Sequence, residues 1–526
     1  MGVPSLFKNI VDTFPGTLSN ENKEPCHILC FDFNCLIHHS KNNMETFLNG
    51  KNTPIRNQEE IIIIEVIRYM IYIIEKVCPN IVYISMDGVV PAGKMKQQKS
   101  RRYKKFYDSE KNKQSSSFDS NKISPGTNFM SKLSGRIKNI MTVGLMQNKK
   151  YKIHFSDINV PGEGEAKIMK YLNTIQNPQN VVIYGLDADL IVLTMLQESH
   201  KIKLMREGVD NEFDFLNINL LKKNILNQYN ISVSKDPNQF FMEFALITSL
   251  GGNDFVDPLP HCKIKFNGLD KLMNAYKQVC NTESLITKYD NQVNIHWNIL
   301  FEIFKVLQPY EDKDLQKIYS KMSNNHSYDV SYEHTNYCNK NHPFYDNYKH
   351  IFESIQFHNP YSWWNQQFPS QDMKSVIKDY LKSLQWNIHY YIFNEPLSWH
   401  WYYTHENAPL LKDIVSFPIS NAPSFTKDNT KPFFPLEQLF YIMPPQSASI
   451  LPKNYQQYIL ENIDSYPRKV KLNVLKGIKN IYCDVLFHTP LLKNRKDIIN
   501  ILNKTEISQY EANRNIFRDN PFFKIG

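Results

Sequence analysis

The chain of 526 residues lacks the short motifs that mark several common classes of protein. It contains no G-x-x-x-x-G-K loop and no G-x-G-x-x-G fingerprint, which argues against P-loop and dinucleotide-binding enzymes. We find no internal repeat and no signal-peptide core in the opening "MGVPSLFKNI". The eight cysteines are scattered without a C-x-x-C pair, a pattern typical of a reduced, intracellular protein without a disulfide framework.

Long uncharged hydrophobic runs and complete zinc motifs are absent as well. The longest apolar segment, residues 59–78, carries Glu65, Arg68 and Glu75, so it predicts a buried helix and not a membrane span. His334, Cys338 and His342 are evenly spaced, but three ligands without a C-x-x-C pair fall short of a structural zinc site. We therefore expect no membrane association and no structural zinc.

The composition supplies a sizeable core and a modest excess of positive charge. Hydrophobic residues make up 42% of the chain and charged residues 21%, and the net charge is +9. Such an excess permits binding of a polyanion without requiring it, because a solvated basic surface gives the same composition. Composition alone does not favour polyanion binding over a solvated basic surface.

Strand-like and helix-like segments alternate along the first part of the chain. We predict strands at 27–37, 80–89, 151–156 and 181–193, helices at 59–78, from about 126 and within 160–172, and an exposed mobile segment at 103–124. This order predicts an α/β fold with a mainly parallel central sheet flanked by helices. We divide the chain into a catalytic α/β region (1–320), a polar linker (321–350) and a mostly helical second region (351–526) packed on the first.

Carboxylates follow several of the predicted strands. Asp32, Asp87 and Asp187 stand at strand ends, and Asp189 is two residues after Asp187. A single such Asp is more often a helix cap or a turn residue. Several together predict a site, because ligands bind outside the carboxyl ends of the strands in open α/β sheets. Two adjacent buried carboxylates also require a cation between them.

Counting further acids next to glycines and strand ends gives a set of seven: Asp32, Asp87, Glu163, Glu165, Asp187, Asp189 and Asp254. Oxygen ligands without Cys or His partners suit Mg²⁺ or Mn²⁺. Two such ions are the usual apparatus of phosphodiester hydrolysis. We place Glu163 and Glu165 in the first turn of a helix, whose dipole favours negative charge.

In order along nearly the whole chain, the sequence resembles the Xrn-type 5′→3′ exoribonucleases. The matching stretches are "MGVPSLFKNI", "FDFNCLIH" (31–38), "MDGVVPAGKMKQQKSRRY" (86–103), "FDSNKISPGTNFM" (118–130), "VPGEGEAKI" (160–168), "YGLDADLIVL" (184–193), "GGNDF" (251–255), "LQWNIHYY" (384–391), "SWHWYY" (398–403) and "KPFFPLEQLF" (431–440). The resemblance implies a 5′-nuclease core of PIN-like fold, completed by the second region into one nuclease domain. All seven acids match catalytic, metal-binding acids of the family.

The resemblance also implies a substrate pocket. Lys94, Gln98, Arg101 and Arg102 match residues that bind the 5′-monophosphate of RNA, a role that suits paired guanidinium groups and an ammonium. Without the family, "KMKQQKSRRYKK" is better explained by a solvated basic face or a generic phosphate-binding patch. A His and a Trp of the family sandwich the terminal base: here His38 with Trp399 or Trp386, Trp401 being a weaker candidate.

The implied function is processive 5′→3′ degradation of 5′-monophosphorylated RNA to nucleoside 5′-monophosphates with two Mg²⁺ or Mn²⁺ ions, following a decapping enzyme. The alternatives are a flap-type 5′ nuclease acting on DNA and an inactive RNA-binding scaffold. We expect a cytoplasmic location, with the nucleus also open. The Asn-, Ile- and Lys-rich usage is typical of an AT-rich genome, such as that of a protist or a large DNA virus, where a viral factory or the virion would be the location.

Two segments depart from the family pattern. Residues 404–407 read Thr-His-Glu-Asn, where the family has a Pro-Tyr-His-Tyr-like run. Asp257 and Pro258 stand where the family has Pro-His. The seven acids are unaffected. The chain also ends near the end of the nuclease core, without the appended domains of longer members.

Overall fold

The computed structural model describes residues 5–50, 55–112, 118–143, 151–185, 187–208, 212–231, 235–280, 283–323, 372–473, 484–487, 489–504 and 506–525. Residues 324–350 of the predicted linker, and with them His334, Cys338 and His342, lie outside these ranges. The strands are β1 (Leu18–Ser19), β2 (Ile28–Asp32), β3 (Ile81–Ser85), β4 (Lys152–Ser156), β5 (Asn180–Tyr184), β6 (Lys201–Glu207), β7 (Phe213–Asn217), β8 (Ile286–Tyr289), β9 (Gln292–Ile295), β10 (Lys471–Asn473), β11 (Asp484–Leu486) and β12 (Phe523–Ile525).

The helices of the first region are α1 (Leu6–Thr13), α2 (Phe33–Gly50), α3 (Ile55–Val77), α4 (Ala92–Asn112), α5 (Asn128–Val143), α6 (Gly164–Asn173), α7 (Asp189–Met195), α8 (Ile218–Gln228), α9 (Pro237–Ser249), α10 (Gly268–Val279), α11 (Trp297–Leu307) and α12 (Glu311–Ser323). Those of the second region are α16 (Met373–Phe393), α17 (Leu411–Ser416), α18 (Pro435–Ile442), α19 (Lys453–Glu461), α20 (Arg495–Lys504) and α21 (Gln509–Ala512). Two 3-10 turns recur below, η2 (Ser120–Lys122) and η7 (Pro445–Ile450).

One eight-stranded sheet runs through the molecule in the order β1-β7-β6-β5-β2-β3-β4-β12. Its centre, from β6 to β4, is parallel, whereas the pairs β1–β7, β6–β7 and β4–β12 are antiparallel. The predicted α/β fold with a mainly parallel sheet is confirmed. The chain runs outward from β2 through β3 to β4 and then returns to β5 on the other side of β2. Ligand sites of open α/β sheets form where the connections diverge in this way.

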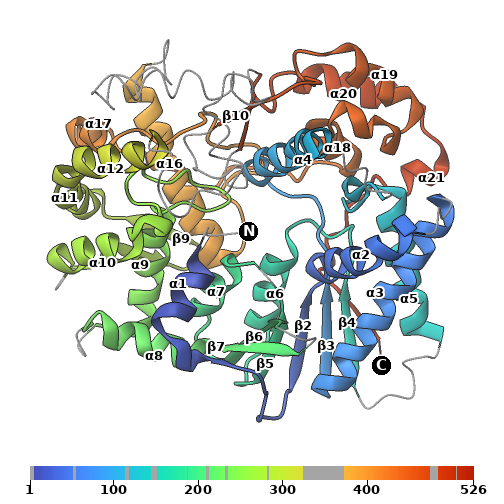
Figure 1. Ribbon diagram of the computed structural model, residues 1–526, viewed down its shortest axis with the longest axis horizontal. Coiled ribbons are helices and arrows are strands. Elements are labelled where there is room, and N and C mark those ends of the chain that lie inside the picture. The colour runs from blue at the N-terminus through green and yellow to red at the C-terminus, as the bar shows by residue number, and fades with distance from the viewer. Residues whose placement is uncertain are drawn as a thin grey trace.

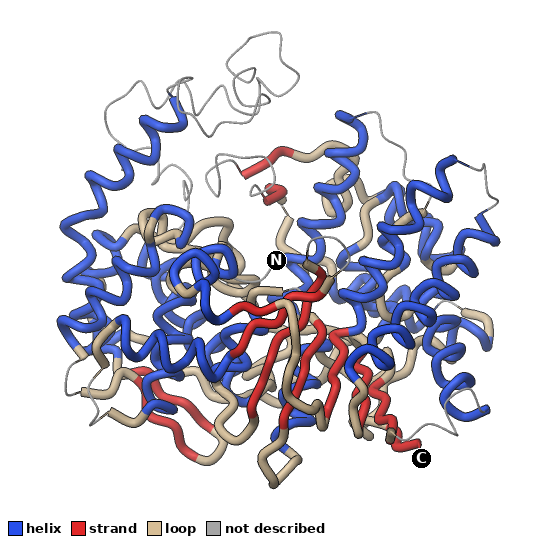
Figure 2. The backbone as a smooth tube through the Cα atoms, turned by 60° about the horizontal axis from the view of Figure 1, so that its bottom comes forward, coloured by secondary structure: helices blue, strands red, loops and turns tan. Residues whose placement is uncertain are grey.

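Helices cover both faces of the sheet, because alternate residues of its buried strands point to opposite sides. In β2, Ile28 and Cys30 belong to the hydrophobic cluster shared with α6 to α9, whereas Leu29 and Phe31 belong to the cluster shared with α2, α3 and α5. Figure 2 shows the strands running between these two groups of helices. The carboxyl ends of β2, β3 and β5 therefore meet at one edge.

Four predicted segments differ from the structure, and one of them is the strand expected at 80–89, which ends at Ser85. The strand expected at 27–37 ends at Asp32, where α2 follows directly, and the strand expected at 181–193 ends at Tyr184, with α7 beginning at Asp189. A short apolar run does not distinguish a buried strand from a buried helix, so both strands were predicted too long. The mobile segment predicted at 103–124 is wrong for its described residues, because α4 continues to Asn112 and residues 118–124 are buried or half-buried; residues 113–117 lie outside the described ranges.

The helix predicted at 59–78 is confirmed as α3 (Ile55–Val77), but it is not buried on all sides. Ile64 is 58% exposed and Tyr72 41% exposed, so one face of α3 meets solvent. No helix in the described part of the chain combines the length and the apolar character needed to cross a membrane.

The second region packs against the first at several places. Helix α16 lies on α9 and β9, and α18 lies beside α4, beyond the carboxyl edge of the strands (Figure 1). Side chains of α16 share a hydrophobic cluster with α6 to α9, and those of α18 share another with the start of α4. The last strand, β12, joins the edge of the sheet beside β4. Both regions thus contribute to one sheet and to common cores.

Candidate active site

Asp32 and Asp87 lie at the carboxyl ends of neighbouring parallel strands. Asp32 is the last residue of β2 and accepts a hydrogen bond from the Cys35 thiol at 2.8 Å. Asp87 follows β3, and its Oδ2 accepts a hydrogen bond from the Asn34 side chain at 2.8 Å. Burial, followed by the negative charge of the nearby Asp87, raises the pKa of Asp32 to about 7. Two desolvated carboxylates at one sheet edge are a site for positive charge.

The segment "GEGE" brings backbone and carboxylates close together at the start of α6. The Gly164 N–H donates to Asp87 Oδ1 at 2.6 Å. A Cβ at this position would stand 2.8 Å from Asp32 Oδ1 and 3.2 Å from Asp87 Oδ1, so only glycine fits here. Glu163 is the N-cap of α6 and not a residue of its first turn as predicted, whereas Glu165 does lie in that turn.

Asp187 and Asp189 follow β5, and Asp254 reaches the same edge from the loop after α9. Asp189 is 1% exposed, and neither of its carboxylate oxygens has a hydrogen-bond partner among the described residues. Burial, followed by the charge of Asp254, raises the pKa of Asp189 to about 7. Glu165 Oε2 is also buried without such a partner, and burial raises the pKa of Glu165 well above its usual value. A cation bound here would supply the partner that these buried oxygens lack within the described part of the chain.

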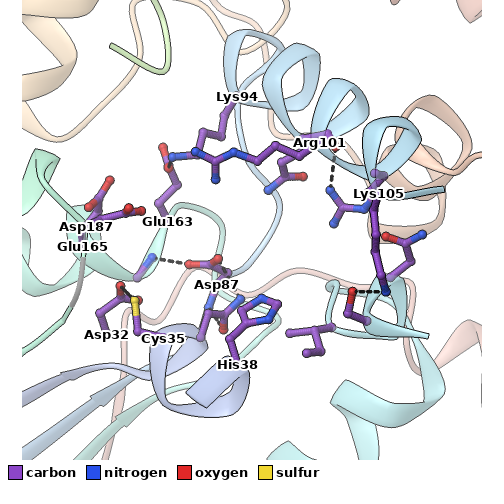
Figure 3. A pocket seen from close by; sticks show the side chains of 17 residues that line it. Asp32, Cys35, His38, Asp87, Lys94, Arg101, Lys105, Glu163, Glu165 and Asp187 are labelled. Atoms are coloured by element: carbon purple, nitrogen blue, oxygen red, sulfur yellow. Dashed lines mark hydrogen bonds and ion pairs between the residues drawn. The ribbon is translucent and has the colours of Figure 1, made fainter. Parts of the chain in front are cut away.

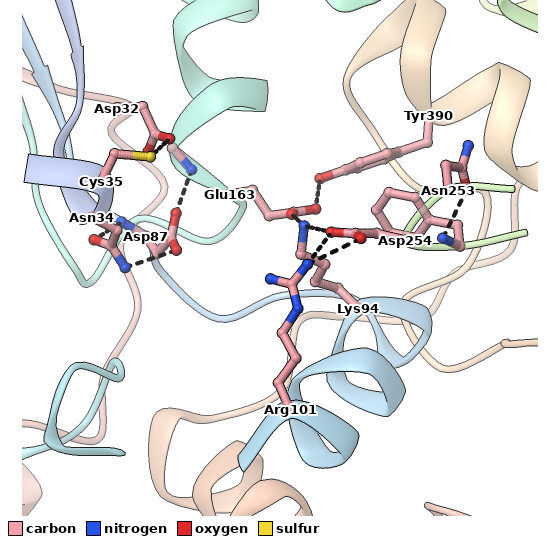
Figure 4. Close-up of polar contacts among 12 residues, drawn as sticks. Asp32, Asn34, Cys35, Asp87, Lys94, Arg101, Glu163, Asn253, Asp254 and Tyr390 are labelled. Atoms are coloured by element: carbon pink, nitrogen blue, oxygen red, sulfur yellow. Dashed lines mark hydrogen bonds and ion pairs between the residues drawn. The ribbon is translucent and has the colours of Figure 1, made fainter. Parts of the chain in front are cut away.

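Lys94 of α4 lies among the acids (Figure 4). Its ammonium contacts Glu163 Oε2 and donates to Asp254 Oδ2 at 2.8 Å, and the residue is 7% exposed. Arg101 adds a contact to Asp254 Oδ1 at 3.3 Å. Burial alone would raise the pKa of Asp254, but Lys94 and Arg101 outweigh it and lower that pKa. Both predicted phosphate-binding cations thus pair with Asp254, one of the seven acids.

A cavity of about 250 Å³ connects the acids to the cationic face of α4. Its lining includes Asp32, Asp87, Glu163, Glu165 and Asp187 together with Lys94, Gln98, Arg101, Arg102 and Lys105. Figure 3 shows the labelled acids on one side of this cavity and Arg101 and Lys105 on the other. Arg101 is seven residues after Lys94 and four before Lys105, so these three cations share one helix face, and Arg102 lies next to Arg101. All four predicted phosphate-binding residues and five of the seven predicted acids therefore line one cavity.

His38 lines the same cavity from α2 (Figure 3). Its side chain is open to the cavity, while the enclosing protein and then the positive charges of Lys41, Arg102 and Lys105 lower the pKa of His38 to about 4. The imidazole is thus neutral at neutral pH, which suits stacking on a base better than holding a phosphate.

The two candidate tryptophans differ in their surroundings. Trp386 is 2% exposed, donates to the Ser398 carbonyl at 3.0 Å, and stacks on Tyr390 with ring centroids 5.2 Å apart. Trp399 is half-buried, and its carbonyl accepts a hydrogen bond from the Ala92 N–H at 2.9 Å, at the start of α4. Neither lines the cavity. Trp386 has the surroundings of a core aromatic, and Trp401, also half-buried, packs against Phe425.

The two departures from the family pattern lie on the other side of α4. Lys96 donates to the carbonyls of Tyr403 and His405, at 3.2 and 2.5 Å. Asp257 and Glu406 border a second, smaller cavity there. None of the residues that depart from the family pattern lines the acid-lined cavity, although Asp254, one of the seven acids, borders the second cavity with them.

Several side chains that we did not single out from the sequence contact the acids. Tyr390 of α16 donates to Glu163 Oε1 at 2.9 Å, and Asn34 and Cys35 hold Asp87 and Asp32. Asn34 and Cys35 directly follow Asp32, so their proximity to the site was available as a signal. Tyr390 lies 227 residues from Glu163, and no local pattern pairs them.

The acids fit divalent cations by their chemistry, although their side chains are not gathered into a finished metal site. Among the described residues, no three His, Cys, Asp or Glu side chains lie close enough together to hold an ion. The ammonium of Lys94 lies between Glu163 and Asp254 instead. The donor set is made of carboxylates alone, and the buried oxygens of Glu165 and Asp189 lack partners. Hard cations such as Mg²⁺ and Mn²⁺ prefer such ligands.

Two family models and several known proteins that are similar to this chain all belong to one family. The family model "XRN 5'-3' exonuclease N-terminus" matches residues 1–208, and the model "Xrn1 helical domain" matches residues 357–524. The chain is 25% identical to 5'-3' exoribonuclease 1 of Homo sapiens over 88% of this chain and 32% of that protein. It is 22% identical to 5'-3' exoribonuclease 1 of Saccharomyces cerevisiae over 90% and 41%, respectively. For the 5'-3' exoribonuclease 2 homolog of Drosophila melanogaster, the identity is 24% over 90% and 68%.

The chain spans about a third to two fifths of the length of the human and yeast relatives. Both family models are matched in order. The residues that the first model covers include β1 to β6 and every side chain that lines the acid-lined cavity, and those that the second covers include α16 to α21. The chain belongs to the XRN family of 5′→3′ exonucleases.

Proposed function

We propose that this chain is a processive 5′→3′ exoribonuclease that hydrolyses 5′-monophosphorylated, single-stranded RNA to nucleoside 5′-monophosphates. The observation that carries this proposal is a single cavity that is lined by carboxylates at one side and by the cations of α4 at the other. A 5′-terminal nucleotide has a phosphate on each side of its sugar, so such a cavity suits it. The names of the relatives support the same activity.

The carboxylates Asp32, Asp87, Glu163, Glu165, Asp187, Asp189 and Asp254 would hold two Mg²⁺ or Mn²⁺ ions. Bound there, the ions would activate a water molecule and stabilise the leaving oxygen. The protein orients these ligands: Gly164 and Asn34 fix Asp87, and Tyr390 fixes one oxygen of Glu163. Such outer partners keep a ligand in a bound orientation.

The 5′-phosphate would bind to α4. Arg102 Nε and Gln98 Oε1 are buried and have no hydrogen-bond partner within the described residues. An orphan guanidinium N–H is costly unless a ligand satisfies it. Lys94 and Arg101 would stand between the 5′-phosphate and the scissile phosphate, because both line the cavity and both contact Asp254. In this arrangement the phosphate-binding cations and the acids share one cavity, instead of forming two separate pockets.

The terminal base would stack on His38, with Trp399 as the tryptophan better placed to assist, because Trp386 is buried on both faces. Stacking contributes about 1–3 kcal/mol per base and tolerates any sequence. An enzyme that releases one nucleotide after another requires this tolerance.

A decapping reaction would supply the 5′-monophosphate that this site accepts. The six described cysteines are free, and we propose the cytoplasm as the place of action.

The experiment is digestion of one RNA sequence with 5′-monophosphate, 5′-hydroxyl, 5′-triphosphate or capped ends, beside 5′-phosphorylated DNA of the same sequence, in Mg²⁺. We expect rapid degradation of the 5′-monophosphate RNA alone. Faster cleavage of the DNA would support a flap-type nuclease instead. Binding of RNA without cleavage of any substrate would support a scaffold.

A further inference from the structure

The wall of the cavity beside Lys105 comes from the loop between α4 and α5. Ser120, Asn121 and Ile123 line the cavity there. Lys105 donates to Ser120 Oγ at 2.7 Å, and Figure 3 shows Lys105 on the side away from Glu163 and Asp187. We call residues 118–127 the end wall. It limits how far a 5′ end can extend past the cations of α4.

Polar contacts join the end wall to the phosphate-binding cations. Arg102 donates to Ser124 Oγ at 2.7 Å, and Ser124 Oγ donates to the Asn121 carbonyl at 2.8 Å. Asp119 caps η2 by accepting from the Asn121 N–H at 2.9 Å. A shift of the end wall would therefore move the partners of Arg102 and Lys105 as well.

The second region holds the end wall from behind. Ser447 of η7 is fully buried, and its Oγ donates to Asp119 Oδ2 at 2.6 Å and accepts from Asn121 Nδ2 at 2.9 Å. One hydroxyl thus joins two side chains of the end wall, and one of its bonds has a carboxylate acceptor. Charge-assisted bonds of this kind are the stronger ones.

A second contact stops the end wall from moving as a body. Gly126 has φ +85°, and a Cβ there would stand 2.8 Å from Pro435 Cβ, so the wall touches α18 directly. Arg514 donates to the Gly126 carbonyl at 2.8 Å from a buried position. Most loops of this kind lie open on a surface and are mobile. This one is held at both ends by residues that come more than 300 positions later.

We propose that Ser447 is a positioning residue for 5′-end selectivity, because it fixes the end wall and thereby the length of the phosphate pocket. The proposal rests on the proposed function and names the residue through which the second region contributes to it. Ser447 touches neither the cavity nor the acids. It acts through Asp119 and Asn121, which hold the wall beside Arg102 and Lys105.

The test compares wild type with Ser447→Ala on RNA of one sequence carrying a 5′-monophosphate or a 5′-triphosphate. We expect the monophosphate-to-triphosphate rate ratio to fall at least about fivefold, the effect of losing one or two hydrogen bonds. Ser447→Thr, which keeps the hydroxyl, should restore most of the ratio. Asp119→Asn, which weakens the bond without deleting the side chain, should shift the ratio in the same direction and replaces Ser447→Ala if that variant does not fold.

The matched control is Ser383→Ala. Ser383 is buried in α16 and donates to the Tyr380 carbonyl at 2.6 Å, three residues earlier in the same helix. This control should lower the melting temperature without changing the ratio. An unchanged ratio in Ser447→Ala and Asp119→Asn, with wild type still selective, would overturn the role of Ser447 alone. A wild type that degrades both ends equally would instead overturn the proposed function, and this inference with it.

Discussion

Removal of one hydroxyl from the second region should weaken the metal site without damaging the fold. Tyr390 donates to Glu163 Oε1 at 2.9 Å, and Lys94 contacts the other oxygen of that carboxylate. In Tyr390→Phe the ring still stacks on Trp386, with centroids 5.2 Å apart, so packing is kept. Glu163 then loses its fixed orientation and remains paired with the ammonium of Lys94, which competes with a metal ion.

The magnitude follows from the kind of bond that is lost. A hydrogen bond to a charged acceptor is worth about 1.5–3 kcal/mol, and loss of a partner that orients a metal ligand typically costs about 10- to 100-fold in metal affinity. We expect the Mg²⁺ concentration for half-maximal hydrolysis to rise by that factor, while the rate at saturating Mg²⁺ falls much less.

The assay is a Mg²⁺ titration of the initial rate on 5′-monophosphate RNA, beside a thermal melt. Tyr380→Phe is the matched control, because Tyr380 lies on the same helix and donates to a backbone carbonyl, that of Asp257, at 3.2 Å. The control should lose stability and keep its Mg²⁺ requirement. Equal Mg²⁺ requirements for wild type and both variants would refute the role that we give to Tyr390.

Three further predictions concern single side chains of the cavity. Asp189→Asn should abolish hydrolysis and raise the melting temperature of the metal-free protein, because it removes a buried charge without partners. Burial raises the pKa of Asp189 to about 7, so ionisation of this residue lowers the stability of the wild type increasingly as the pH rises from about 4 to 7. In thermal melts, the difference in melting temperature between variant and wild type should therefore widen across that range and then level off. His38→Ala should shorten processive runs, counted on a sequencing gel, at an unchanged Mg²⁺ requirement; a lower melting temperature with normal runs would make His38 a core residue only. Arg101→Ala should slow hydrolysis of 5′-monophosphate RNA about ten- to a hundredfold, while the rate on 5′-hydroxyl RNA changes little. Equal slowing on both substrates would show that Arg101 acts mainly on Asp254.

The meeting of the strand-end acids could be predicted, because neighbouring parallel strands end at the same edge of a sheet. Strands β2, β3 and β5 are neighbours and run in one direction, so residues that follow them meet at one edge. Asp32, Asp87 and Asp187 therefore came together as expected. The lengths of the strands were less predictable, because the apolar residues after Asp32 suit a buried helix as well as a strand.

The ion pairs inside the site could not be predicted from spacing. Lys94 and Asp254 are 160 residues apart, and their contact depends on how α4 approaches the loop after α9. The bond between Asp119 and Ser447 is of the same kind, because it joins two regions whose relative position only the folded chain defines. The strand-end pattern indicated acids of the site and the family resemblance indicated the cations, whereas tertiary packing decided which cation meets which acid.

The most direct measurement of the central claim is the identity of the first product from RNA labelled at its 5′-phosphate. The label should appear at once as a nucleoside 5′-monophosphate, in the presence of Mg²⁺ and not in excess chelator, while the 3′ end of the same molecules stays intact. Release of label within a longer oligonucleotide, or loss of the 3′ end first, would contradict the assignment of the cavity to a 5′-terminal nucleotide.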